Sequence, residues 1–333
     1  RPAWQGPVRL ETHCAPAWTR GRAGRVAWMH WRLPEVAHQW RADVLHAPGY
    51  VGPKGWRGPM VLTVYDVFAL SHPEWSKWAN VVHYRWALPD SVRRARVVVV
   101  PSEFVRREVV ARLGVNPERV RVVMLGISAA MTPAKQEAVE AVRRRYGLSG
   151  PYLLFVGNLE PKKNVEGIVR GFELAAGRIP HDLVVAGKPA WKCGRALQAM
   201  RNSPFRSRIR ELSYVCAEEL PALYSGADLL VHWARCEGWG LTPVEAMACG
   251  TPAVVSDGGA LPEVAGQVAP VVPLGDPAQL ADAIVELLGD EQRRLALRQR
   301  GLEWARQFTW RRHAECLLPL YEEAAQGALI GAA

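Results

Sequence analysis

The chain has 333 residues, about twice the length of a typical domain, so two domains are expected. Its hydrophobic content of 49% and charged content of 22% are ordinary for a globular protein, which excludes a wholly disordered chain, a collagen and a small disulfide scaffold. The net charge of +10 comes entirely from residues 1–130, which hold 19 basic and 9 acidic residues, whereas residues 131–333 hold 23 of each. The longest aliphatic run, Val97–Val100, is far too short to cross a membrane, and no basic-then-apolar leader indicates a secretory signal.

The first part of the chain alternates short β-branched runs with a helical pattern. Strands are expected at 61–65, 96–102 and 119–125. A helix is expected from Ser102 to Leu113, with Ser102 as its N-cap and Gly114 just past its end. Runs that are apolar throughout suit strands buried on both faces of a parallel sheet, so the pattern predicts a wound α/β domain.

The stretch from Ser128 to Gly150 breaks this rhythm with a proline, a charged helix and two glycines, as a linker carrying a helix would. The alternation then restarts, which predicts a second α/β domain in tandem with the first. Its expected strands are 152–157, 182–187, 213–216, 228–233 and 253–257. Its expected helices are 165–176, 193–202, 217–225 and 243–249, followed by helices to the end of the chain.

The sequence has neither a P-loop nor a G-x-G-x-x-G motif, which weakens the nucleoside triphosphatase and dehydrogenase interpretations. Another loop offers material for binding phosphate. Gly157 ends an expected strand, Asn158 follows it, and Lys162 and Lys163 lie a few residues further on. Ligands of open α/β sheets bind beyond the carboxyl ends of the strands, where two lysines could neutralise a diphosphate. The alternative is an ordinary solvated turn.

A glycine-rich turn after the expected strand 228–233 is the stronger signal. Gly238 and Gly240 allow the backbone to approach a ligand closely, and the helix that we expect to start at Thr242 would attract an anion to its first turn. Glu237 and Glu245 flank the turn, and a carboxylate can accept hydrogen bonds from two neighbouring hydroxyls of a sugar or ribose. The alternative is a capping box, Thr242-x-x-Glu245, in which Glu245 has only a structural role.

At these residues the chain resembles family 4 glycosyltransferases. Glu237 and Glu245 match the E-x7-E signature of that family, within a block that extends to Pro252. The segment 156–164 is similar to the family's V-G-x-L-E-P-R-K-N motif, and matches in family order cover roughly residues 40–325. Further segments that carry the resemblance are 43–48, 65–66, 72–74, 102–104, 182–188, 219–228 and 258–263.

The resemblance implies a fold and a domain plan. It implies the α/β GT-B architecture, in which two Rossmann-like domains face a cleft. Residues 1–128 would form the acceptor-side domain, joined by a C-terminal helix at 308–333, and 129–150 the linker. Residues 151–307 would form the donor domain. The first strand and glycine-rich loop that open the family's first domain have no counterpart in this sequence.

The resemblance also implies an activity: retaining transfer of a hexose from a nucleotide-diphospho-sugar, GDP-mannose or a UDP-sugar, to a glycan or lipid-linked acceptor. Glu237, Lys163 and Lys162 would be catalytic. Tyr65 and Asp66 would lie on the sugar or acceptor side. The donor would contact Gly157, Asn158, Lys162, Lys163, Gly240, Leu241, Thr242 and Glu245. No cofactor or metal is expected, since basic residues serve the leaving group in such folds and no Asp-x-Asp pair occurs.

Several positions depart from the family pattern. Lys162 replaces an arginine, so a bidentate phosphate contact becomes a point charge, and Tyr65 replaces a histidine. The family's P-N-G tripeptide is replaced at 124–126, and its P-S dipeptide at 233–234. A catalytically silent nucleotide-sugar-binding or scaffold protein of the same fold is therefore an alternative, and an epimerase of this fold is a third, which Tyr65 disfavours.

The basic first part also holds nine of the 14 tryptophans, Trp4 to Trp86. The segment from Trp75 to Arg96 is expected to be a helix interrupted near Pro89, and it suggests docking on an anionic membrane, because Trp75, Trp78 and Trp86 lie there among Lys77, Arg85, Arg93, Arg94 and Arg96. The alternative is buried tryptophans and solvated arginines. Nucleic acid is not expected, because no base-reading motif occurs. The six cysteines form no C-x-x-C pair, as in free thiols of a reducing cytoplasm, so the expected location is cytoplasmic, peripheral on the inner membrane face.

Overall fold

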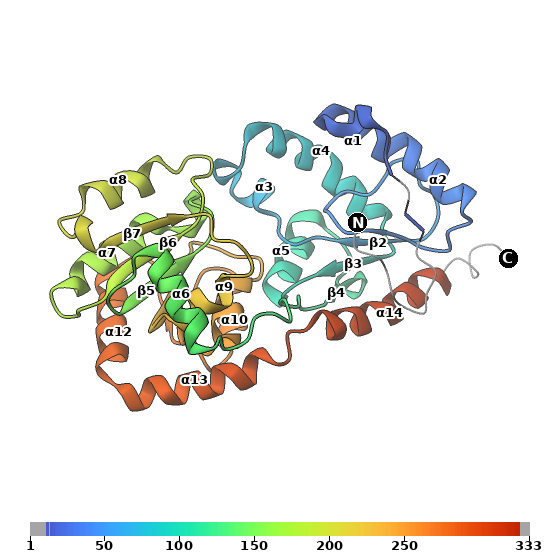
Figure 1. Ribbon diagram of the computed structural model, residues 1–333. Helices are drawn as coiled ribbons and strands as arrows, with labels where there is room; N and C mark the ends of the chain where they lie inside the picture. Colours follow the sequence, from blue (N-terminus) through green and yellow to red (C-terminus); the bar gives the residue numbers. More distant parts are fainter. Residues whose placement is uncertain (1–10, 13, 327–333) are drawn as a thin grey trace.

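The computed structural model describes residues 11, 12 and 14–326, and two parallel sheets organise them (Figure 1). The first sheet has the order β1-β2-β3-β4. Its strands are β1 (Leu45–Ala47), β2 (Met60–Thr63), β3 (Val97–Val100) and β4 (Val120–Val122). Every residue of β2 and β3 is buried, as expected for strands covered on both faces. No strand precedes β1 among the described residues.

The second sheet has the order β10-β9-β8-β5-β6-β7. Its strands are β5 (Tyr152–Val156), β6 (Asp182–Ala186), β7 (Ile209–Ser213), β8 (Leu229–His232), β9 (Ala253–Ser256) and β10 (Val271–Val272). Strand β5 pairs with β6 on one side and with β8 on the other, so the direction of winding reverses between β5 and β8. Ligands of such sheets bind at this switch point, beyond the carboxyl ends of the strands.

Helices cover both sheets. Those of the first part are α1 (Arg22–Ala27), α2 (Leu33–Gln39), α3 (Phe68–Ser71), α4 (Trp78–Arg94) and α5 (Glu103–Leu113). Those of the second part are α6 (Gln136–Tyr146), α7 (Val165–Ala176), α8 (Gly194–Asn202), α9 (Leu220–Ser225), α10 (Leu241–Ala248), α11 (Leu261–Ala265), α12 (Pro277–Gly289) and α13 (Glu291–Ala305). Short helical turns are η1 (Ala17–Arg20), η2 (Trp28–Arg32), η3 (Pro73–Trp75), η4 (Pro117–Arg119), η5 (Pro161–Lys163) and η6 (Arg206–Arg208).

The last helix, α14 (Trp310–Gln326), returns to the first sheet (Figure 1). Its Leu317 and Leu320 are buried in a cluster with residues of β2 and β3, and Tyr321 Oη lies 2.8 Å from His46 Nδ1 of β1. Helix α6, in the stretch between the sheets, packs on α9 of the second domain, and Arg143 donates to the carbonyl of Gly226. The chain between the two sheets is thus anchored to the second domain.

Four expectations about elements were wrong. The stretch after 257, expected to be helical to the end of the chain, contains the short strand β10. The strand expected at 213–216 lies at Ile209–Ser213, on the sheet edge, where the exposed Arg210 and Glu211 obscure the strand pattern. Helix α4 runs unbroken through Pro89, because Leu88 and Val92 on either side of the proline are buried in the first core. Helix α10 begins at Leu241 rather than Thr242.

Candidate functional site

The site lies at the switch point of the second sheet, where the loops after β5 and β8 meet. In the loop after β5, Asn164 takes a left-handed backbone conformation, φ 53°, at the end of η5. Its buried side chain donates to the carbonyl of Trp233, 3.2 Å away, directly after β8. This bond ties the two loops together, and it brings Lys162 and Lys163 of the first loop against Glu237 of the second.

Glu237 is a buried carboxylate that is held by two lysines and has a histidine beside it. Lys163 Nζ donates to Oε1, and Lys162 Nζ lies 3.3 Å from Oε2. His232 Nε2 lies 3.4 Å from Oε1. Burial alone would raise the pKa of Glu237, but Lys163 and Lys162 outweigh burial and hold that pKa well below its usual range. Glu237 is therefore ionised at neutral pH.

Lys162 connects this cluster to the first domain. Its ammonium also lies 3.7 Å from Glu160, and it stands 5.2 Å from the centre of the Phe68 ring. Burial lowers the pKa of Lys162, but Glu237 and Glu160 overcome that effect and raise the pKa above its usual value. The pKa of Glu160 is raised by burial, which its lysine neighbours only partly oppose.

The turn after Glu237 leads into α10. Gly240 is the N-cap residue, at φ 119°, and no side chain caps the helix. The capping box is therefore wrong, since the left-handed Gly240 is the N-cap and the helix starts at Leu241, one residue before Thr242. Glu245 instead accepts a hydrogen bond from the buried Tyr224 hydroxyl, 2.9 Å away. Burial raises the pKa of Glu245, against the opposing effect of the Tyr224 bond.

The remaining expected donor residues lie around this cluster. Gly157 directly follows β5 at φ 149°, near the Lys163 side chain, and Asn158 is exposed beside it. Leu241 and Thr242 form the half-buried first turn of α10. The structure thus joins Lys162, Lys163 and Glu237 by direct contacts, and α10 starts a few residues after Glu237 in the chain.

Tyr65 and Asp66 of the first domain face the same turn. A Cβ added to Gly238 would lie 2.2 Å from the Tyr65 carbonyl oxygen and 3.2 Å from Asp66 Cβ, so only glycine allows this approach. Asp66 accepts hydrogen bonds from the Tyr50 hydroxyl at 2.9 Å and from the Phe68 amide at 3.0 Å. The first domain therefore closes directly over the loop that carries Glu237.

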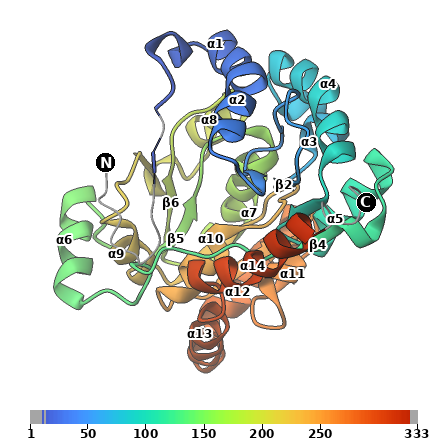
Figure 2. The same cartoon turned by 90° about the vertical axis from the view of Figure 1, so that its right-hand side faces the viewer.

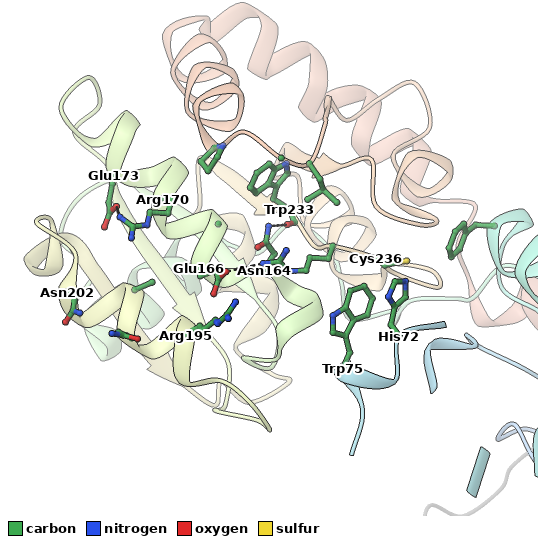
Figure 3. A pocket seen from close by; sticks show the side chains of 18 of the residues that line it. His72, Trp75, Asn164, Glu166, Arg170, Glu173, Arg195, Asn202, Trp233 and Cys236 are labelled. Carbon is green, nitrogen blue, oxygen red and sulfur yellow. Dashed lines mark hydrogen bonds and ion pairs between the residues drawn. The ribbon is translucent and has the colours of Figure 1, made fainter. Parts of the chain in front are cut away.

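Two cavities flank this contact between the domains. One of about 360 Å³ has Tyr50, Asp66 and Tyr84 on the first domain and Glu160 and Lys162 on the second. The other, of about 900 Å³, lies against α7 and α8. Figure 3 shows His72 and Trp75 of the first domain facing Asn164 and Cys236 across it. The two cavities share Trp75. Among the described residues, no group of three or more His, Cys, Asp or Glu is placed to hold a metal ion.

Sequence reasoning missed four contributors to the site. Glu160 and Asn164 were within the expected loop but carried no assigned role. Tyr224 lies in the segment 219–228 that carries the family resemblance, and His232 lies in the expected strand 228–233, but neither was given a role. Their contacts with Glu245 and Glu237 come from the packing of α9 and β8 against α10 and the loop.

Family models match both domains. The model described as Glycosyltransferase Family 4 matches residues 2–130, and the model described as Glycosyl transferases group 1 matches residues 150–290. A D-inositol 3-phosphate glycosyltransferase of Corynebacterium efficiens is 30% identical over 302 residues, which cover 86% of this chain and 70% of that protein. The chain belongs to glycosyltransferase family 4. The O-antigen chain mannosyltransferase B of Escherichia coli is 29% identical over 270 residues, covering 80% of this family 4 chain and 71% of the relative.

Solved structures share the fold of this family 4 glycosyltransferase. Anabaena HepE, in complex with UDP and glucose, superposes with a TM-score of 0.75 at 19% identity, over 91% of this chain and 83% of HepE. WaaG, a glycosyltransferase involved in lipopolysaccharide biosynthesis, superposes with a TM-score of 0.68 at 19% identity, over 95% and 88% of the two chains. The expected GT-B fold is confirmed, and the relatives support a transferase rather than a silent scaffold.

Proposed function

We propose that this glycosyltransferase moves a hexose from a nucleotide-diphospho-sugar to a hydroxyl of a glycan or lipid-linked acceptor, with retention of configuration at C1. The observation that carries the proposal is the buried Glu237 held by Lys162 and Lys163 at the switch point of the donor-side sheet. This cluster places a carboxylate that can bind sugar hydroxyls beside two cations that can bind a diphosphate. In the reaction the bond from C1 to the diphosphate breaks, the acceptor oxygen bonds to C1, and its proton passes to the departing diphosphate.

The roles follow from the charge that develops. As the diphosphate leaves, negative charge grows on its oxygens, and Lys162 and Lys163, together with the first backbone amides of α10, would stabilise that charge. Glu237 would accept hydrogen bonds from sugar hydroxyls, and Glu245 from the ribose, each as an ionised carboxylate. Tyr65 and Asp66 would face the sugar or acceptor from the first domain.

For the donor we propose GDP-mannose or a UDP-sugar. The printed names of the relatives support both, since one is a mannosyltransferase and HepE is in complex with UDP and glucose. The test is a panel of UDP- and GDP-sugars, with thermal shift and release of nucleoside diphosphate as readouts. A ligand at 100 times its Kd adds about 2.7 kcal/mol of stability. Lys163→Ala should abolish turnover, and Lys135→Ala, an exposed lysine before α6, should not. Full turnover in Lys163→Ala would refute the assignment.

The second part of the proposal is docking of the first domain on an anionic membrane. On α4, Trp78, Val82 and Trp86 follow one another at intervals of four residues and are 78%, 49% and 57% exposed. Trp31 is 69% exposed, and α1, α2 and α4 lie at the same end of the domain in both views (Figures 1 and 2). Tryptophan favours the headgroup level of a bilayer. No helix among the described residues is long and apolar enough to span a membrane.

Vesicle co-sedimentation tests this surface. Arg94 and Arg96 are poor test positions because they donate to backbone carbonyls within the domain, whereas Lys77 and Arg85 are exposed. Binding should increase with anionic lipid and decrease with salt, at about 1 kcal/mol for each basic residue near the surface. Lys77→Glu with Arg85→Glu should weaken binding. Equal binding to neutral and anionic vesicles would contradict the proposal.

A further inference from the structure

A carboxylate of the second domain caps a helix of the first. Glu263, in α11, accepts hydrogen bonds from the backbone amides of Glu103 at 2.8 Å and Phe104 at 2.7 Å, with one carboxylate oxygen for each. These are the first two amides of α5, which have no partner within their own helix. A negative charge at this position also interacts favourably with the helix dipole. The guanidinium group of Arg107 also lies near this carboxylate, at 4.0 Å.

A second bond crosses the domains at the same place. Ser102, the N-cap of α5, accepts from the Val105 amide with its hydroxyl oxygen and donates to the carbonyl of Gly238, 2.8 Å away. The start of α5 is therefore joined to the second domain at two points, Glu263 and Gly238.

Both points are linked directly to Glu237. Gly238 is its neighbour in the chain, and the amide of Ala260, three residues before Glu263, donates to the Glu237 carbonyl at 2.8 Å. Gly259, at φ 68°, packs so closely that an added Cβ would lie 2.4 Å from the same carbonyl. A displacement of Glu263 with α5 would therefore shift the backbone that carries the buried carboxylate.

We propose that Glu263 is a positioning residue that couples closure of the two domains to the placement of Glu237. The proposal rests on the function proposed above for Glu237. Glu263 touches neither donor nor acceptor; it holds α5 against the second domain, and the closed arrangement is the one in which transfer occurs. Opening of this contact releases the Tyr65–Asp66 face from the Gly238 turn and leaves the donor lysines in place.

The first measurement is hydrogen exchange of single amides in the whole protein. The Glu103 and Phe104 amides have Glu263 as their acceptor, so their protection reports on this contact alone. We expect both to be protected in the wild type, to exchange faster in Glu263→Ala, and to be intermediate in Glu263→Gln, which keeps one acceptor oxygen. Glu103→Gln is the matched control, because it removes a carboxylate at the same helix start and leaves the interdomain bonds. Equal exchange in wild type and Glu263→Ala would overturn the proposal.

The second measurement is the division of the effect between kcat and nucleotide affinity. Loss of two charge-assisted hydrogen bonds should lower kcat by a factor on the order of 10 to 100 in Glu263→Ala, with a smaller loss in Glu263→Gln. Nucleotide affinity should stay within about twofold, because Lys162, Lys163 and Glu245 all belong to the second domain. Faster exchange with unchanged kcat, or nucleotide affinity lost in step with kcat, would overturn the positioning role. Absence of transferase activity in the wild type would instead refute the proposed function, and the exchange result would still decide the contact.

Discussion

The paired charges around Glu237 make a prediction about stability that does not depend on the substrate. Lys163→Met removes the cation that donates to Glu237 Oε1 and leaves the carboxylate 8% exposed, with His232 and the more distant Lys162 as its remaining partners. Truncating one partner of a buried ion pair leaves an uncompensated buried charge. We expect Lys163→Met to lower the free energy of unfolding by about 3–5 kcal/mol.

The geometry sets the scale of the effect. At the 3.3 Å separation of Lys162 Nζ and Glu237 Oε2, an effective dielectric constant of 20 gives an attraction of about 5 kcal/mol. Desolvation of the two ions offsets several kcal/mol of that attraction. Lys162 is also more exposed, at 21% against 15% for Lys163, so Lys162→Met should have about half the effect of Lys163→Met.

A double-mutant cycle measured by urea unfolding checks the reasoning. Glu237→Gln removes the charge that Lys163→Met leaves unpaired, so the double variant should be more stable than the sum of the single effects predicts, by about 2–3 kcal/mol. Gln136→Met, an exposed position at the start of α6, controls for the introduced methionine. Additive effects of Lys163→Met and Glu237→Gln would mean that the two side chains do not interact in solution, which would refute the buried ion pair.

Three further predictions concern the effect of pH, the proposed ribose ligand Glu245 and the approach of the two domains. Because the pKa of Glu237 is lowered, the stabilisation by its ionised form is fully present above its ordinary pKa of 4.5 and is lost as the pH falls through the lower folded value. The difference in stability between the wild type and Lys163→Met, measured by thermal melting, should therefore shrink below about pH 4.5. Tyr224→Phe removes the hydrogen bond that lowers the pKa of Glu245, so that pKa should rise further. If the ionised Glu245 binds the ribose, nucleotide affinity measured by calorimetry should increase with pH, and in Tyr224→Phe that increase should occur at higher pH. An unshifted curve would contradict a ribose role. Gly238→Ala places a Cβ 2.2 Å from the Tyr65 carbonyl oxygen and should lower kcat by about 100-fold, whereas Gly289→Ala, with open space around it, should leave kcat unchanged.

Local chemistry made much of the fold predictable. Helix α5 begins and ends where its caps indicate, since the Ser102 hydroxyl accepts from the Val105 amide and Gly114 takes φ 60°. The central strands β5, β6 and β8 are apolar enough to be recognised from composition alone. The edge strand β7 was displaced in the prediction, because a strand with one open edge tolerates charged side chains and loses the apolar run. The two-residue β10 is too short to leave a pattern.

The position of the candidate site in the fold was predictable where a motif follows an expected strand, and was not predictable where the contacts depend on packing. The loop after β5 and the turn after β8 were both expected at the carboxyl ends of strands, and the sheet order brings these two strands side by side. The capping-box prediction failed because that pattern takes no account of the residue before Leu241. Gly240, in the left-handed conformation, is the N-cap and starts the helix earlier, and the Glu245 side chain accepts a hydrogen bond from Tyr224 instead. No spacing rule could show that Glu263 would bond to a helix 160 residues earlier.

On the proposed function, the ion pairs of Glu237 affect how tightly the donor binds. Lys162 and Lys163, which would stabilise the diphosphate, form ion pairs with Glu237 in this structure. When the donor binds, the diphosphate therefore has to replace Glu237 as the partner of these lysines. A buried carboxylate that loses two cations needs new hydrogen-bond donors, because burial alone raises its pKa. The hydroxyls of a bound sugar are such donors, whereas His232 lies 3.4 Å away and burial lowers its pKa. A nucleoside diphosphate without its sugar would draw the lysines away and supply nothing to Glu237. We therefore expect the intact donor to bind more tightly than the nucleoside diphosphate alone, and Glu237→Gln to reverse that order in a calorimetric comparison; tighter binding of the bare diphosphate to the wild type would refute this coupling.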